Sequence, residues 1–222
     1  MPCGETARYS VFYDSLIHLQ RPPLVDVVMA RSANVAENRN LITDRALEVG
    51  AEWIFYVDDD QVLPSFTLTN LLKHDKDVVS GLYVKRQAPY VPHVYNEEDE
   101  KGFCSPKMLT PLSGGLVKVL ATGAGCMLVK TKIFEKLEKP YWRLGQIEPE
   151  GWGDDLHFCH RVRELGFEIW ADLDTRVGHI SHGILWPKKE QSGDWSTVLV
   201  EGPNIVASWP AAQEATKLLK VM

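Results

Sequence analysis

The chain has 222 residues, 45% of them hydrophobic and 24% charged, and a formal net charge of -6. This composition is that of a folded domain and excludes an intrinsically disordered chain. The negative charge argues against a protein whose main activity is non-specific binding to nucleic-acid phosphates. The four cysteines form no CxxC pair, so neither a disulfide framework nor a structural zinc site is indicated. No stretch approaches the roughly 18 apolar residues that span a bilayer.

The first predicted elements form a β-α-β unit. Residues 24–30 (LVDVVMA) are short, apolar and β-branched, which is typical of a strand. Residues 34–49 carry apolar side chains at helical spacing, and Asn34 followed by Glu37 fits a capping box. The apolar run 53–57 (WIFYV) then predicts a strand that is buried on both faces of a parallel sheet.

The rest of the chain keeps alternating between helix and strand patterns. We expect a helix over 66–74, a strand over 78–83, a long proline-bearing excursion over 89–111, strands over 116–121 and 126–129, helices over 131–137 and 154–165, and a strand over 168–171. This order predicts a mixed α/β protein.

Three carboxylates directly follow the apolar strand 53–57. Asp58, Asp59 and Asp60 should therefore lie at the carboxyl end of a strand, where open α/β sheets place their ligands. Adjacent carboxylates repel one another unless a cation neutralises them, and oxygen ligands favour Mg²⁺ or Mn²⁺. Asp58 and Asp60 point the same way if strand geometry continues. The alternative is a solvated acidic turn before the next helix.

The stretch YVDDDQVLP at 56–64 resembles the DxD region of GT-A glycosyltransferases, especially family 2-like enzymes. The same letters also satisfy the first motif of haloacid-dehalogenase-like phosphatases, in which Asp58 would be the nucleophile. In those phosphatases the nucleophile strand normally comes first in the fold. Here a predicted strand and helix precede Asp58, which favours the glycosyltransferase resemblance.

A second stretch, GWGDDLHFCHR at 151–161, is similar to the glycosyltransferase pattern W-G-x-E-D followed by a helix that bears an Arg. The resemblance implies that Asp155 is the general base toward the acceptor hydroxyl and that Asp154 positions the acceptor. Both acids also sit in the first turn of a predicted helix, where a carboxylate stabilises the helix dipole without any catalytic role.

Further residues match the same family in the expected order along the chain. The resemblance implies that a late histidine completes the metal ligands Asp58 and Asp60, with His179 the better match and His182 the reserve. An imidazole ligand suits Mn²⁺ better than Mg²⁺. Two more segments would contact the donor. Arg39 with Asn40 matches an Arg-Asn pair that lies near the donor phosphates or the DxD loop. Gly123 and Gly125 belong to a TGxxM-like segment that lies against the donor sugar.

Taken together, these matches predict a single GT-A domain over residues 1–222, a twisted, mixed, mostly parallel sheet flanked by helices. Residues 183–222 are expected to be a C-terminal extension that shapes the acceptor site. The predicted activity is metal-dependent transfer, with inversion, of a sugar from a nucleotide diphosphate sugar, with a UDP-sugar favoured, to a hydroxyl. The alternatives are the phosphatase and a catalytically silent domain that binds glycans or sugar nucleotides.

The acceptor is predicted only as a class. Compact GT-A proteins of this kind occur among bacterial and bacteriophage enzymes, whose acceptors include surface glycans and hydroxymethylated DNA bases. We therefore expect a soluble polar macromolecule as acceptor, in the cytoplasm of a bacterial or phage-infected cell. Basic and aromatic residues would form a stacking surface for it, unless they are scattered over the surface: Lys85, Arg86, Lys188, Lys189, Tyr83, Tyr90, Tyr95, Trp186 and Trp195.

Overall fold

The computed structural model describes residues 10–32, 34–86, 90–96, 114–144, 153–181, 184–201 and 204–210. The helices are α1 (Ser10–Ile17), α2 (Val35–Glu48), α3 (Thr67–Lys73) and α4 (Asp154–Glu164), with a 3-10 helix at Thr131–Ile133. The strands are β1 (Trp53–Val57), β2 (Gln61–Val62), β3 (Val78–Leu82), β4 (Val94–Tyr95), β5 (Leu116–Val119), β6 (Ala121–Thr122), β7 (Cys126–Lys130), β8 (Ile169–Arg176), β9 (Gly178–Ile180), β10 (Ile184–Lys189), β11 (Trp195–Glu201) and β12 (Asn204–Pro210). Within these ranges, no helix combines the length and apolar character that a bilayer crossing demands.

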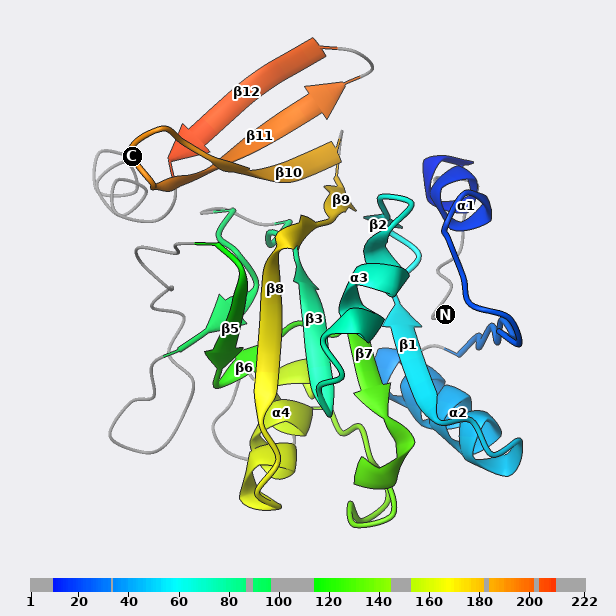
Figure 1. The fold of residues 1–222 in the computed structure, drawn as a ribbon. Coiled ribbons are helices and arrows are strands. Elements are labelled where there is room, and N and C mark those ends of the chain that lie inside the picture. Colours follow the sequence, from blue (N-terminus) through cyan, green and yellow to red (C-terminus); the bar gives the residue numbers. More distant parts are fainter. Residues whose placement is uncertain are drawn as a thin grey trace.

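In the described part of the chain, the central sheet has five strands in the order β1-β7-β3-β8-β5 (Figure 1). β7 is antiparallel to both β1 and β3, β8 is parallel to β3, and β5 is antiparallel to β8. β1, β3 and β8 therefore run in the same direction, and their carboxyl ends share one edge of the sheet. We call this edge the carboxyl edge. The segments that leave it are residues 58–60, 83–86 and 177–179.

Helices cover both faces of this sheet. Successive strand residues face opposite sides, so Ile54 and Tyr56 pack with buried residues of α2 and α4, while Val57 packs with those of α1 and α3. Figure 1 shows α3 in front of the sheet and α2 and α4 behind it. The next residue on the side of Ile54 and Tyr56 is Asp58, which therefore faces the layer of α2 and α4.

A second sheet starts at the carboxyl edge, with the order β12-β11-β10-β9-β2 (Figure 1). β2 follows Asp60 directly, and its pairing with β9 sets Gln61 opposite His179. The described residues of the C-terminal extension form the antiparallel strands β10, β11 and β12, which continue this sheet. The extension thus shares a sheet with two predicted site segments.

A third, two-stranded sheet pairs β4 with β6 and fixes the residue that precedes β4. The amide of His93 donates to the carbonyl of Tyr83 (2.8 Å), and the amide of Gly123 donates to the carbonyl of His93 (3.0 Å). His93 is consequently held between the end of β3 and the turn at 123–125.

Several sequence predictions are confirmed. α2, α3 and α4 and strands β1, β3, β7 and β8 lie where the hydrophobic patterns indicated, and Asn34 caps α2 by accepting from the amides of Ala36 (2.8 Å) and Glu37 (3.3 Å). The sheet is mixed, as expected. The prediction of a mostly parallel sheet is wrong, because β7 separates β1 from β3 and leaves β3–β8 as the one parallel pair among its described neighbours.

Two local predictions also fail. Residues 24–30 form no strand beyond a single bridge residue at Ala30, and Leu24 is fully exposed in a positive-φ conformation (φ 63°) after two prolines. β-branched residues favour extended backbone, but a strand also requires a neighbouring strand. The helix expected over 131–137 is reduced to the 3-10 turn Thr131–Ile133, since seven residues are too few for propensity alone to sustain an α-helix and packing decides the backbone.

Candidate functional site

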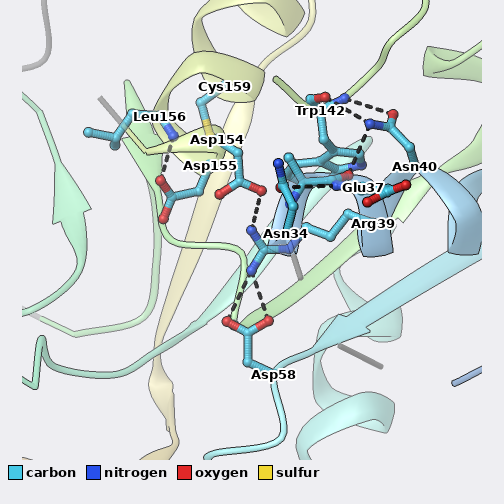
Figure 2. A network of polar contacts seen from close by, with 12 residues as sticks. Asn34, Glu37, Arg39, Asn40, Asp58, Trp142, Asp154, Asp155, Leu156 and Cys159 are labelled. Carbon is cyan, nitrogen blue, oxygen red and sulfur yellow. Dashed lines mark hydrogen bonds and ion pairs between the residues drawn. The ribbon is translucent and has the colours of Figure 1, made fainter. Parts of the chain in front are cut away.

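Arg39 on α2 joins the two acidic motifs at the carboxyl edge. Its Nη2 donates to both carboxylate oxygens of Asp58 (2.8 and 3.0 Å), and its Nη1 donates to Oδ2 of Asp154 (2.5 Å) (Figure 2). Only 3% of Arg39 is exposed, and its guanidinium lies 5.3 Å from the ring centre of Trp142. We call Arg39, Asp58 and Asp154 the arginine cluster.

Charge and burial oppose each other within the arginine cluster. Burial alone lowers the pKa of Arg39, but Asp58, Asp154 and Asp155 together raise it above its ordinary value. Burial raises the pKa of Asp58 and of Asp154, and Arg39 counteracts part of that rise in both. One buried cation thus balances one of two negative charges and lessens the repulsion between the carboxylates.

Asp155 lies next to Asp154 but is not bound by Arg39. Its Oδ1 accepts from the amide of Leu156 (2.8 Å), as Figure 2 shows, and its Oδ2 lies 3.5 Å from Nε2 of His93. Burial raises the pKa of Asp155, while the charge of Arg39 and the Leu156 amide partly lower it. A raised pKa brings a carboxylate closer to the range in which it accepts a proton effectively near neutral pH.

Tyr83, the first residue after β3, connects His93 to the backbone turn at 123–125. The Tyr83 hydroxyl accepts from the amide of Gly125 (3.0 Å) and lies 3.2 Å from Nδ1 of His93. Burial, with Lys85 and His179 nearby, lowers the pKa of His93 to about 3, so its ring is neutral at physiological pH. We call Tyr83, His93 and Asp155 the histidine cluster.

The glycines of the 123–125 turn leave room for these side chains. A Cβ on Gly123 would lie 2.0 Å from the Tyr83 hydroxyl and 2.2 Å from Nδ1 of His93. A Cβ on Gly125 would lie 2.9 Å from Nε2 of Gln61 and 3.2 Å from Oδ2 of Asp58. In this structure both predicted donor-contact glycines are therefore packed against the site's own side chains.

Asp60 and His179 form a third group at the carboxyl edge. Nδ1 of His179 lies 2.6 Å from the carbonyl of Val84, and its Nε2 lies 3.5 Å from Oδ1 of Asp60. Oδ2 of Asp60 pairs with Nη1 of Arg86 (2.8 Å). Burial alone raises the pKa of Asp60, but His179 and Arg86 outweigh it and hold this pKa below its ordinary value.

The Asp60–His179 pair fits a cation better than Asp58 does. A carbonyl accepts only, so Nδ1 of His179 carries a hydrogen. The lowering of the Asp60 pKa applies when Nε2 also carries one; in the neutral ring Nε2 instead presents a lone pair to the carboxylate oxygen. Oδ1 of Asp60 is buried without a hydrogen-bond partner. Two such atoms are compatible with a proton or a metal ion between them. Among the described residues, however, no group of three or more His, Cys, Asp or Glu side chains is placed to hold a metal.

The remaining predicted residues have other surroundings. Asn40 accepts at Oδ1 from the amide of Trp142 (3.1 Å) and donates from Nδ2 to the carbonyls of Ala36 (2.9 Å) and Trp142 (2.8 Å). Its amide is thus used to hold the segment at Trp142 against α2. Asp154 is 5% exposed and bound to Arg39, which places it as a support for Arg39. His182 lies outside the described residues.

A cavity of about 1140 Å³ opens beside the arginine cluster, between α2 and residues 139–144. Asn34, Asn40 and Trp142 line it, whereas Asp58 and Asp155 do not. The arginine cluster and this cavity are therefore neighbours through the contact of Arg39 with Trp142, and the cavity is lined by Glu37 and Asp44 rather than by Asp58 or Asp155.

The predicted basic and aromatic stacking surface is not formed as expected. Tyr83, Tyr95 and Trp195 are 3%, 2% and 4% exposed and belong to the core. Lys188 pairs with Glu190 (3.0 Å) within β10 and its turn. The prediction that these three rings are available to stack on an acceptor is therefore wrong, because Tyr95 and Trp195 lie on the buried sides of β4 and β11 and Tyr83 packs against the 123–125 turn.

Sequence reasoning missed the site roles of Tyr83, His93 and Arg86. Arg86 was assigned to an acceptor surface, yet it pairs with Asp60. The signal for Tyr83 and Arg86 was their place at the end of the predicted strand 78–83 and just beyond it, which predicts the carboxyl edge as it does for Asp58. His93 had no comparable signal, since its position depends on the pairing of β4 with β6.

The comparisons with known proteins concern the fold. No family model and no curated protein matches the sequence. The structure is similar to that of the viral protein A197 from STIV, with a TM-score of 0.59, 17% identity, and coverage of 93% of this chain and 94% of that chain. The likeness spans nearly both chains and supports a mixed α/β fold, and at this identity it carries no statement about activity.

Proposed function

We propose that this chain is a metal-dependent glycosyltransferase of GT-A type, which moves a sugar from a nucleotide diphosphate sugar to a hydroxyl acceptor. The observation that carries the proposal is the meeting of the two acidic motifs on Arg39, which binds carboxylates 19 and 115 residues away in the sequence. Both motifs resemble segments of one family, the GT-A glycosyltransferases. Their convergence at the carboxyl edge is what a single catalytic centre requires.

Asp155 is the proposed general base. It would take the proton of the acceptor hydroxyl while the hydroxyl oxygen attacks the anomeric carbon and the bond to the diphosphate breaks. A single displacement of this kind inverts the anomeric configuration. Burial raises the pKa of both acids, but Asp154 accepts a hydrogen bond from Arg39 and Asp155 does not, which supports the role of base for Asp155.

Asp60 and His179 are the proposed protein ligands of Mn²⁺ or Mg²⁺, with Asp58 contributing only after Arg39 shifts. The ion would neutralise the negative charge of the leaving diphosphate. The unpartnered Oδ1 of Asp60 and the Nε2 that faces it support this assignment. Arg86, now on Asp60, and Lys85 are the nearby cations that would face the donor phosphates.

The phosphatase alternative is less well supported. A nucleophilic Asp58 needs a carboxylate oxygen free to attack phosphorus, and both oxygens accept from Nη2 of Arg39 at 3.0 Å or less. An aspartyl-phosphate intermediate on Asp58 would nevertheless identify that activity and refute the glycosyltransferase.

The proposal is tested by release of nucleoside diphosphate from a panel of nucleotide sugars, UDP-sugars first, with Mn²⁺, Mg²⁺ or chelator. We expect metal-dependent turnover. Asp155→Asn should keep donor affinity and lower turnover by about 100- to 10,000-fold, the usual loss for a general base. Asp75→Asn, at an exposed carboxylate, is the matched control. Wild-type turnover in Asp155→Asn would exclude Asp155 as the base.

The acceptor is proposed as a hydroxyl of a soluble polar macromolecule, either a glycan or a hydroxymethylated DNA base. The burial of Tyr83, Tyr95 and Trp195 leaves only the half-buried Tyr90 and Trp186 of the predicted stacking rings for DNA. Labelled-sugar transfer to hydroxymethylated and unmodified DNA over a salt series separates the two classes, because phosphate contacts weaken as salt rises. Transfer to neither DNA would leave the glycan.

A further inference from the structure

The hydrogen-bond chain through Tyr83 and His93 has a defined direction. The amide of Gly125 donates to the Tyr83 hydroxyl, so the single hydroxyl proton of Tyr83 is left for another acceptor. Nδ1 of His93 lies 3.2 Å away and is the acceptor in reach. A neutral imidazole that accepts at Nδ1 carries its hydrogen on Nε2.

Nε2 is also the ring nitrogen that lies near Asp155. Nε2 lies 3.5 Å from Oδ2 of Asp155, while the other oxygen of the same carboxylate accepts from the amide of Leu156 (2.8 Å). The contact of 3.5 Å is long for a hydrogen bond, and catalytic contacts are often long before substrate binds. Each oxygen of Asp155 therefore has one donor next to it.

The surroundings of His93 are built around this orientation. Its ring contacts Tyr83 and Tyr95 edge-on, with centroids 5.4 and 5.6 Å apart. Its backbone is hydrogen-bonded on both sides, to Tyr83 and to Gly123. Gly123 has no room for a Cβ, which would lie 2.2 Å from Nδ1 of His93. A ring flip or rotamer change would have to displace these neighbours.

We propose that His93 is a positioning residue for Asp155: held as the Nε2–H tautomer by the Tyr83 hydroxyl, it donates to Oδ2 and orients the carboxylate toward the acceptor hydroxyl. The catalytic part of this inference rests on the proposed function, whereas the tautomer and its contact with Asp155 do not. Among the described residues, the Leu156 amide donates to Oδ1 of Asp155, and His93 is the donor that lies next to Oδ2.

The structural part is tested by NMR on protein labelled with ¹⁵N-histidine, with the His93 signals identified by their loss in His93→Gln. Wild-type protein is expected to show a neutral ring with the hydrogen on Nε2. Tyr83→Phe keeps the ring but removes the proton given to Nδ1, and should yield a mixture of tautomers. A wild-type ring with its hydrogen on Nδ1, or no response to Tyr83→Phe, would overturn the proposal.

The contact with Asp155 is read from the ¹³C signal of its side-chain carboxyl carbon, assigned with Asp155→Asn. His93→Leu removes the donor and should shift this signal, whereas His93→Gln retains an amide N–H that can reach the carboxylate and should restore much of it. His74→Gln, a histidine paired with Asp172 away from this cluster, is the control and should leave the signal unchanged. An unchanged signal in His93→Leu would also overturn the proposal.

The catalytic part is tested by transfer kinetics once the donor panel has given turnover. His93→Leu should lower kcat on the order of 10- to 100-fold, as for other outer-shell partners of functional side chains, with the donor KM unchanged. His93→Gln should recover part of kcat. Equal losses in both variants, or a loss carried by KM, would reduce His93 to a structural residue. A wild-type protein without turnover contradicts the proposed function, while the NMR result still decides the tautomer and the contact.

Discussion

The arginine cluster and the Asp60–His179 pair lie at the same edge of the sheet but differ in how their charges are balanced. In the arginine cluster both oxygens of Asp58 accept hydrogen bonds from a buried guanidinium. In the Asp60–His179 pair one carboxylate oxygen is buried with no partner and faces an imidazole nitrogen. The protein itself supplies hydrogen bonds to both oxygens of Asp58 but leaves Oδ1 of Asp60 without one.

This difference indicates where each group acts. A buried charge without a partner destabilises the fold, so removing one member of the arginine cluster should lower stability. A buried polar atom without a hydrogen-bond partner is instead a position where a bound ligand can supply the missing interaction. The arginine cluster is therefore expected to dominate stability, and Asp60 with His179 to dominate the response to metal.

The largest effect is expected for Arg39→Met, which leaves the buried Asp154 and the half-buried Asp58 without their shared cation. Removing one partner of a buried ion pair typically costs about 3–5 kcal/mol of unfolding free energy. The measurement is urea-induced unfolding. Arg45→Met, on the exposed face of the same helix, should change stability by less than about 0.5 kcal/mol. Similar losses in the two variants would contradict the cluster's structural role.

A bound metal ion should stabilise the protein through the Asp60–His179 pair and not through the arginine cluster. If Asp60 and His179 hold Mn²⁺, the ion at 100 times its dissociation constant adds about 2.7 kcal/mol to the unfolding free energy. Asp60→Asn should remove this gain and cost little stability without metal. Thermal unfolding with and without Mn²⁺ measures both quantities. An equal gain from Mn²⁺ in Asp60→Asn would place the ion elsewhere.

Gly123→Ala tests the packing of the histidine cluster. The added methyl would overlap the Tyr83 hydroxyl and the His93 ring, at 2.0 and 2.2 Å, and overpacking of this kind costs about 1–3 kcal/mol. Gly125→Ala meets its nearest side-chain atom at 2.9 Å and should cost less. Unfolding free energies of the two variants decide the order, and a larger loss for Gly125→Ala would contradict it.

The smallest effect is a pH dependence carried by His93. Its pKa is about 3 in the folded protein and 6.5 when unperturbed, so the unfolded chain binds the additional proton between these values. Stability contributed by the neutral ring is therefore present above pH 6.5 and is lost as the pH falls, by about 1 kcal/mol between pH 6.5 and 5.5. Wild-type and His93→Gln unfolding over this range isolates the effect. Parallel curves would show that His93 does not contribute.

Much of the local structure could be predicted because it depends on side chains close in sequence. The run 53–57 and the helical spacing of 35–48 and 154–164 were sufficient for β1, α2 and α4. The strand predicted at 24–30 is absent because a local preference for extended backbone does not make a strand unless another strand pairs with it. β2 and β9 were missed because two or three residues carry too little periodicity.

The sequence by itself determined that acidic residues follow a buried strand and begin a helix, and a family resemblance grouped them with Arg39 and His179. Only the tertiary structure decided the pairs: Arg39 with Asp58 and Asp154, Asp60 with His179, and His93 with Asp155. These pairs depend on the insertion of β7 between β1 and β3, on the register of β2 with β9 and on the pairing of β4 with β6. Strand order and register are set by packing of the whole chain, which short-range sequence patterns do not encode.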